Sequence, residues 1–206
     1  WNVTVRRSPE ERLRDRLRTS LTGLGLTEVV TNTLIDERWA ASCGATDPPI
    51  RIANPISAEA GILRPSLLPS LLNVARWNLN RKIERIAVFE IGKRFGRPVP
   101  GGAPAETTEV AGLLIGPRGR TFWEAGDPEV DFYDAKGILE DLFALLTERP
   151  LTTPPSPSNL YEPGSSADVL LATDAVGSLG EVRRPTAEAF DIRGRAFAFT
   201  LAFEKL

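Results

Sequence analysis

Carboxylates, arginines and lysines are the side chains of this sequence that could carry chemistry, because histidine is absent and Cys43 is the only cysteine. Without an imidazole, Ser-His and Cys-His catalysis and histidine-ligated zinc are excluded. Four carboxylates close in the sequence could act as paired catalytic acids: Asp127, Glu129, Asp131 and Asp134. Their spacing does not define such a pair. We interpret them as a solvated loop and the first turn of a helix, where negative charge is favoured.

Glycine-rich loops that bind phosphate are a second kind of site to consider. The pairs Gly92-Lys93 and Gly101-Gly102 lack the spacing and the following helix that would direct backbone N–H groups at a phosphate. Residues 116–120 (GPRGR) are basic, but a surface turn explains them equally well. The sequence therefore predicts neither a phosphate loop nor a metal site.

The composition is that of an ordinary globular protein, with 206 residues, 42% hydrophobic, 25% charged and a formal net charge of −2. We expect a single domain over residues 1–206, and the absence of methionine favours a fragment of a longer protein. The net charge gives no electrostatic reason to seek nucleic acid. No apolar run approaches the roughly 18 residues of a membrane helix. Residues 1–7 show no signal-peptide pattern, so we expect a cytoplasmic protein.

The N-terminal region predicts a capped helix followed by a strand. Ser8 can cap the helix, Pro9 suits its first position and Glu11 can close a capping box. An apolar stripe follows at spacings of four and three, consisting of Leu13, Leu17, Leu21 and Leu24. Arginines on the other faces alternate with acidic residues, so we interpret them as solvated. Residues 26–35 are rich in β-branched side chains and are predicted to form one strand.

The remaining elements follow from hydrophobic periodicity and turn residues. Helices are predicted at 37–42, 64–81 (capped by Ser66), 131–146 and 185–190; strands at 50–53, 83–95, 108–115, 169–171, 175–179 and 195–204; loops at 98–105 and 150–163; and a turn at Thr173-Asp174. This order lacks the steady strand–helix alternation of a doubly wound parallel sheet. We therefore predict an α+β domain with a largely antiparallel sheet flanked by helices.

The last predicted strand has bulky residues on one face and small residues on the other. Phe197, Phe199, Leu201 and Phe203 alternate with Ala196, Ala198, Thr200 and Ala202. Such a strand is typical of a central position in a sheet, with helices packed closely over the small face.

The segment 87–95 (AVFEIGKRF) resembles the second signature motif of class II aminoacyl-tRNA synthetases, in which such a strand leads into Phe-Arg-x-Glu. In active members the Arg holds the ATP α-phosphate through its planar, forked guanidinium, and the Glu helps to hold the nucleotide. Here the Arg position holds Gly96 and the Glu position holds Pro98. Arg97 is one residue out of register, which on a strand directs it to the opposite face. The resemblance therefore implies a dismantled ATP clamp.

The end of the chain resembles the third class II motif as the catalytic phenylalanine subunit carries it. In that subunit, glycines correspond to Thr200 and Ala202, and an arginine that covers the nucleotide corresponds to Lys205. Side chains in place of both glycines would crowd a backbone that must approach ATP closely. Lysine also lacks the flat, forked contacts of arginine.

An ordered series of segments is similar to the β chain of bacterial phenylalanyl-tRNA synthetases, and it runs from about Pro9 to Leu206. The segments are 54–57 (NPIS), 63–69 (LRPSLLP), 76–81 (RWNLNR), 130–137 (VDFYDAKG), 163–167 (PGSSA) and 180–182 (GEV). The sequence departs from that pattern at Glu162, where a His is common, and at Ser165, where an Arg is usual.

This resemblance implies a class II synthetase-like domain without cofactors of its own, in an α2β2 enzyme that charges its tRNA with phenylalanine. The α subunit would perform the chemistry with ATP and magnesium, and tRNA would be bound only by the intact assembly. The first class II motif, a helix followed by a strand, usually builds the dimer interface and corresponds to residues 8–35. We therefore expect the α-subunit contact to involve Leu13, Leu17, Leu21, Val29 and Thr31. The alternative for the leucines is an internal core.

Two other functions remain open from the sequence. The chain could be an autonomous class II ligase acting as a homodimer, which the missing arginine and glycines disfavour. It could also be an RNA-binding module, which the net charge of −2 disfavours. If the domain is a docking platform, its exposed apolar surface should also allow weak self-association.

Overall fold

The computed structural model describes residues 7–45, 47–55, 57–98, 103–119 and 128–206. The helices are α1 (Pro9–Gly23), α2 (Glu37–Ser42), α3 (Leu68–Leu79), α4 (Phe132–Leu146) and α5 (Arg184–Ala189), with short 3-10 helices η1 (Ala58–Ala60) and η2 (Phe203–Lys205). The strands are β1 (Thr27–Glu28), β2 (Leu34–Ile35), β3 (Ile62–Leu63), β4 (Ile86–Pro98), β5 (Pro104–Ile115), β6 (Leu151–Thr152), β7 (Tyr161–Leu171), β8 (Asp174–Val182) and β9 (Ala196–Ala202). No helix in these ranges is long and apolar enough to cross a membrane.

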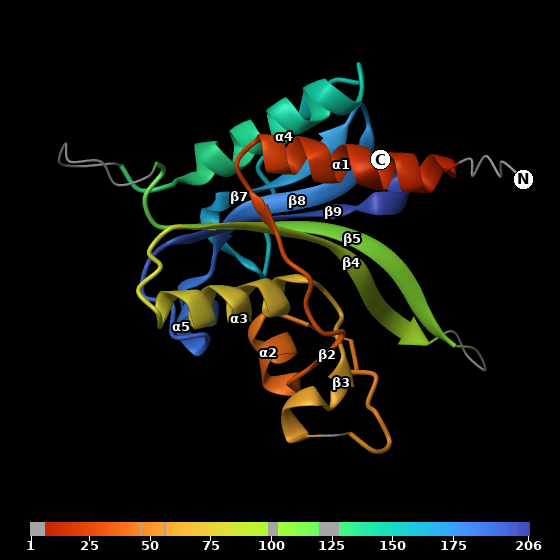
Figure 1. Cartoon of the computed structure of the whole chain (residues 1–206), viewed down its shortest axis with the longest axis vertical. Coiled ribbons are helices and arrows are strands. Elements are labelled where there is room, and N and C mark those ends of the chain that lie inside the picture. Colours follow the sequence, from red (N-terminus) through yellow and green to blue (C-terminus); the bar gives the residue numbers. More distant parts are fainter. Residues whose placement is uncertain (1–6, 46, 56, 99–102, 120–127) are drawn as a thin grey trace, which may run out of the picture.

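A seven-stranded sheet in the order β1-β4-β5-β9-β8-β7-β6 organises the domain. Its pairings are antiparallel except that β1 runs parallel to β4. Helices α1 and α4 cover one face, and α3 lies on the other face together with α2 and α5 (Figure 1). The two short strands β2 and β3 pair separately. The predicted α+β class with a largely antiparallel sheet is confirmed.

Strand β9 occupies the central position that its alternation predicts, between β5 and β8. Phe197 and Phe199 face the core under α1 and α4, whereas Ala196 and Ala198 face the core under α3. The Phe199 ring lies directly over the backbone of Gly112, where an added Cβ would be 2.3 Å from the ring. The bulky face of the strand therefore fills one core, and the small face allows the helix on the other side to approach closely.

Helix α1 begins as the sequence predicts. The Ser8 hydroxyl accepts a hydrogen bond from the Glu11 amide, and the Glu11 carboxylate accepts one from the Ser8 amide. Leu17 and Leu21 are fully buried in the core between α1, α4 and the sheet. Reciprocal capping and one buried stripe thus fix both the start and the orientation of the helix.

The prediction of one strand over residues 26–35 is wrong. Pairing with β4 ends after Glu28, and the chain then leaves the sheet edge to form β2 with a different partner. The cause is Thr31, whose hydroxyl donates to the Glu90 carboxylate at 2.6 Å instead of facing a neighbouring strand. The predicted strand at 50–53 is likewise reduced to a single bridge between Arg51 and Ile62.

Several boundaries also differ from the prediction because strand pairing extends past local breaker residues. Pro104 and Ala105, predicted as loop, continue the β4–β5 hairpin opposite Pro98 and Gly96. This hairpin extends well away from the rest of the sheet (Figure 1). The β7–β8 turn comes one residue earlier than predicted, because Ala172 adopts the left-handed conformation with φ of 56°. Helix α3 begins only at Leu68, and Ser66 caps it from outside by accepting the Leu68 amide.

A buried ion pair joins three segments that are far apart in the sequence. The Arg64 guanidinium donates to the Glu90 carboxylate at 2.9 Å, and the two side chains are 2% and 3% exposed. Arg64 also donates to the Thr31 hydroxyl at 2.6 Å and to the Lys93 carbonyl at 2.9 Å. Gly92 makes room for this arrangement, since an added Cβ there would be 2.6 Å from the guanidinium.

Phe199→Ala should destabilise the domain severely, because removing a buried phenylalanine typically costs about 3–5 kcal/mol. The matched control is Arg184→Ala, at a side chain that is 85% exposed and whose ion pair with Glu188 lies in solvent. Urea denaturation checks both variants. Similar midpoints for the two would contradict the central placement of β9.

Arg64→Met should cost about 3–5 kcal/mol, because it leaves the Glu90 carboxylate buried without its cation. Replacing both residues, as Arg64→Met with Glu90→Leu, should recover much of that loss because no charge then stays buried. A double-mutant cycle measured by urea denaturation checks this coupling. Additive losses in the double variant would show that the two side chains act independently.

Candidate functional site

Three of the five motif positions singled out from the sequence line one cavity. Thr200 and Ala202 of β9, together with Lys205 of η2, border a hollow of about 260 Å³. Gly96 and Pro98 do not border it; they lie near the far end of β4, opposite Ala105 and Pro104. The tertiary structure thus gathers the positions of the third motif and separates them from those of the second.

Small side chains and a close strand contact create this hollow. The β8 backbone passes β9 so closely at Gly177 that an added Cβ would be 2.1 Å from the Thr200 carbonyl oxygen. The Lys205 ammonium crosses to β8 and donates to the Ala175 carbonyl at 2.7 Å. The Thr200 and Ser178 hydroxyls lie 3.3 Å apart on the neighbouring strands. The lysine is therefore anchored to the protein backbone at the rim of the cavity.

Glu109 of β5 is a buried carboxylate in the wall of the same cavity. Its Oε2 atom accepts the Leu67 amide at 2.6 Å and the Ser66 hydroxyl at 3.1 Å, and the residue is 6% exposed. Burial raises the pKa of this carboxyl above its ordinary value of 4.5, against the opposing effects of the Leu67 hydrogen bond and the Arg94 charge. Sequence reasoning missed Glu109. The available signal was a charged residue at the entrance of an otherwise apolar strand.

Tyr161 of β7 is fully buried, and its hydroxyl has no hydrogen-bond partner among the residues that the structure describes. Its ring lies over Gly180, where an added Cβ would be 2.5 Å away. Burial raises the pKa of this hydroxyl, while the nearby Ser178 and Thr200 hydroxyls oppose that effect. No sequence signal pointed to Tyr161, because it follows a proline-rich segment predicted to be a loop.

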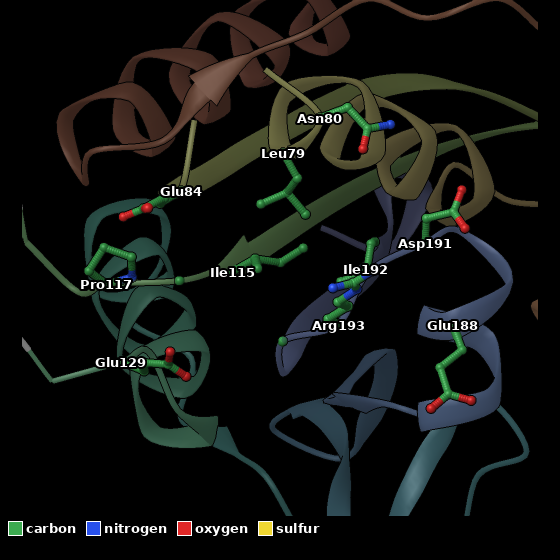
Figure 2. Close-up of a pocket in the computed structure, with 12 residues that line it drawn as sticks. Leu79, Asn80, Glu84, Ile115, Pro117, Glu129, Glu188, Asp191, Ile192 and Arg193 are labelled. Carbon is green, nitrogen blue, oxygen red and sulfur yellow. The ribbon is translucent and has the colours of Figure 1, made fainter. Parts of the chain in front are cut away.

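A second and larger hollow, of about 770 Å³, lies at the opposite end of the sheet (Figure 2). Its floor is apolar, formed by Leu79, Ile115 and Ile192, and its rim carries the carboxylates of Glu84, Glu129, Glu188 and Asp191 with the guanidinium of Arg193. These rim carboxylates are all exposed, and Glu188 is paired with Arg184. Exposed carboxylates keep their hydration, so this rim alone does not define a binding site.

The acidic residues noted in the sequence start a helix, as interpreted. Asp131 accepts the amides of Tyr133 and Asp134, and the Asp134 carboxylate accepts the Asp131 amide. Arg118 bridges the two carboxylates. Asp127 lies outside the described residues. Within the described ranges, no group of three or more His, Cys, Asp and Glu side chains is placed to hold a metal ion.

The residues predicted to contact a partner subunit mostly face inward. Leu17 and Leu21 lie in the core of this chain, as the core alternative expects, and leave no side-chain surface for a partner. Leu13 and Val29 are half-buried and pack against the two cores. Thr31 is committed to the Arg64–Glu90 pair.

The exposed apolar residue of this region is Val30, which is 90% exposed and lies between two inward-facing neighbours. Sequence reasoning chose the opposite face of the same segment.

Glu109→Gln should make the stability of the domain less dependent on pH. Because the folded pKa of Glu109 is raised, the folded chain binds its proton more tightly than the unfolded chain does. This contribution is present at low pH and is lost as pH rises from about 4.5 through the folded pKa. Gln keeps an oxygen for the Leu67 amide and has no charge to desolvate. Urea midpoints across pH 5–8 should decline less in the variant; parallel curves would contradict the raised pKa.

Comparison with known proteins identifies relatives over nearly the whole chain. The family model for the "Phenylalanyl tRNA synthetase beta chain CLM domain" matches residues 2–203. The phenylalanine–tRNA ligase β subunit of Moorella thermoacetica is 37% identical over 217 residues, which cover 98% of this chain and 26% of that protein. The corresponding subunit of Geobacillus kaustophilus is 34% identical over 202 residues, covering 97% of this chain and 25% of that protein. The chain thus spans about a quarter of the length of these relatives.

The solved structure of Desulfitobacterium hafniense PylSc, a pyrrolysyl-tRNA synthetase, has the same fold. It superposes with a TM-score of 0.71 at 20% identity, covering 97% of this chain and 68% of that one. This likeness confirms the class II synthetase-like fold. Since the family model spans almost every residue and the β-subunit relatives share about a third of the sequence, the chain belongs to the family of phenylalanyl-tRNA synthetase β chain CLM domains.

Proposed function

We propose that this chain is a non-catalytic, synthetase-like domain of a phenylalanine–tRNA ligase β subunit, which packs against a catalytic α subunit. The α subunit would use ATP and magnesium to activate phenylalanine, in an α2β2 enzyme. This domain would supply surface and rigidity rather than chemistry, and tRNA would be bound by the intact assembly. Family membership and the β-subunit relatives support this role.

The observation that carries the proposal is the set of side chains on β9 and η2. Where active members of the class carry glycines, Thr200 and Ala202 place side chains on the cavity wall. Where those members carry a nucleotide-covering arginine, Lys205 is bonded to the Ala175 carbonyl. A lysine offers a point charge and lacks the flat, forked surface that stacks on a base and grips a phosphate. These substitutions remove the contacts that would distinguish ATP from water.

The docking surface is proposed to lie at the sheet edge formed by β1 and the residues after it. Val29 donates its amide to the Phe89 carbonyl at 2.8 Å, which holds this segment on the sheet. Thr31 is bound inward by Glu90 and Arg64. Together these contacts turn the Val30 side chain outward into solvent. An exposed aliphatic side chain on a rigid sheet edge suits an apolar partner surface and also allows weak self-association of the isolated chain.

The isolated chain should neither bind ATP at submillimolar affinity nor catalyse phenylalanine-dependent exchange of pyrophosphate into ATP. The physical reason is the absence of the arginine and glycines of the nucleotide site at Gly96, Thr200, Ala202 and Lys205. Calorimetry with magnesium–ATP and an exchange assay measure these properties, with the assembled αβ enzyme as positive control. Exchange by the chain alone would favour the alternative of an autonomous class II ligase.

Val30→Glu should abolish capture of the cognate catalytic subunit, because an unpaired charge would have to be desolvated in the interface. The matched control is Ile83→Glu, which charges an exposed aliphatic residue on the turn between α3 and β4. Pull-down with the α subunit measures capture, and circular dichroism checks that both variants stay folded. Undiminished capture by a folded Val30→Glu variant would place the docking surface elsewhere.

A further inference from the structure

The cavity on the α3 face of the sheet keeps a polar interior although its nucleotide contacts are absent. Its walls come from β4, β5, β8, β9 and η2, through Arg94, Glu109, Gly177, Thr200 and Lys205. Its volume of about 260 Å³ lies just below the usual range for ligand sites, about 300–1,000 Å³. A molecule far smaller than a nucleotide is therefore the occupant to consider.

Two buried polar groups at this cavity have unused hydrogen-bonding capacity. The Tyr161 hydroxyl is without a partner in the described part of the chain. It lies near the Ser178 and Thr200 hydroxyls and close enough to Glu109 to feel its charge. Glu109 receives both of its hydrogen bonds on Oε2, which leaves Oε1 available. Buried polar groups in native proteins are satisfied by protein, water or ligand, so this inner wall calls for a molecule that donates and accepts hydrogen bonds.

Charges of both signs border the same hollow. Arg94 acts on the Glu109 carboxyl through its charge, so the two groups are close neighbours. The guanidinium of Arg94 makes one hydrogen bond, to the Thr107 hydroxyl, and the ammonium of Lys205 makes one, to the Ala175 carbonyl. Each cation therefore retains N–H donors for a further acceptor. A simple anion would meet the Glu109 carboxylate, and a simple cation would meet Arg94 and Lys205.

We propose that this cavity binds a small zwitterion that carries an ammonium and a carboxylate, the chemical class of the free α-amino acids. The ammonium donates to Glu109 Oε1 and to the hydroxyls of Thr200 and Tyr161. The carboxylate accepts from Arg94 and Lys205 at the rim. This binding involves no nucleotide and no covalent step, and it does not depend on docking of the α subunit. Its test can therefore fail while the proposed function holds, and the reverse is also true.

The first experiment screens this chain against the twenty L-amino acids one at a time by saturation-transfer NMR. At least one amino acid should bind saturably. For that ligand, the matching amine without the carboxylate and the matching acid without the ammonium should each bind at least roughly tenfold more weakly, because each loses a charge-assisted contact. If no amino acid binds, or if a single-charge analogue binds equally well, the zwitterion proposal is overturned.

The second experiment assigns the site with two conservative variants. Glu109→Gln removes the charge that receives the ammonium, and Tyr161→Phe removes the unpartnered hydroxyl; each should weaken binding at least roughly tenfold. Tyr161→Phe should leave the urea midpoint unchanged or higher, since that hydroxyl makes no hydrogen bond within the described protein. Lost binding therefore cannot be ascribed to misfolding. Tyr133→Phe, at a tyrosine that is 73% exposed, is the matched control and should bind normally.

Unchanged affinity in both cavity variants would place any amino-acid site elsewhere and overturn the proposal. A crystal structure grown with the best ligand gives an independent check. Density for the ligand between Glu109 and Lys205 supports the proposal, whereas a single ordered water on the Tyr161 hydroxyl in the presence of saturating ligand contradicts it.

Discussion

The buried pair of Arg64 and Glu90 is the interaction on which the arrangement of this domain depends. Taking two charges out of water is expensive, and the cost is offset only when geometry and additional hydrogen bonds are good. Here the guanidinium also binds the Thr31 hydroxyl and the Lys93 carbonyl, so its hydrogen-bonding capacity is largely used. The backbone of Arg64 adds bonds to Thr33 and Phe95. The pair therefore locks the N-terminal segment, the approach to α3 and β4 together.

That lock explains the geometry of both proposed surfaces. On the sheet edge, holding Thr31 inward forces its neighbour Val30 outward. On the sheet face, the approach to α3 brings Ser66 and the Leu67 amide onto the Glu109 carboxylate. A displacement of Arg64 would be transmitted to both places, because packed cores and buried polar networks have few alternative arrangements.

The central strand β9 separates the structural and the ligand-facing parts of the molecule. Its phenylalanines fill the core under α1 and α4, which makes the strand rigid. Its opposite face carries only small side chains, and beyond the start of α3 these leave a hollow instead of a packed core. Substitution of the nucleotide-binding glycines by Thr200 and Ala202 thus reduces the site without filling it. A reduced site with a buried carboxylate and an unpartnered tyrosine hydroxyl is suited to a small polar molecule.

Local patterns in the sequence were sufficient for elements whose residues interact mainly with near neighbours. The capping box at Ser8 and Glu11, the helix starting after Asp131, and the alternation along β9 all depend on spacings of two to four residues. The motif positions at Gly96, Pro98, Thr200, Ala202 and Lys205 could also be read directly, since a departure from a pattern is visible without a structure. From these, the α+β class and the resemblance to class II synthetases were predictable.

Long-range contacts decided the rest. The strand predicted at 26–35 is broken because Thr31 binds a carboxylate 59 residues away. Leu17, Leu21 and Val30 have side chains equally suited to a core or an interface, and only the position of the sheet decides which of them face water. Glu109 and Tyr161 come from different strands and meet the same cavity through sheet pairing that no local spacing encodes. The sequence by itself determined which chemistry this domain has lost; the tertiary structure decided which polar groups remain together, because buried charge and unpaired hydroxyls acquire meaning only from what surrounds them.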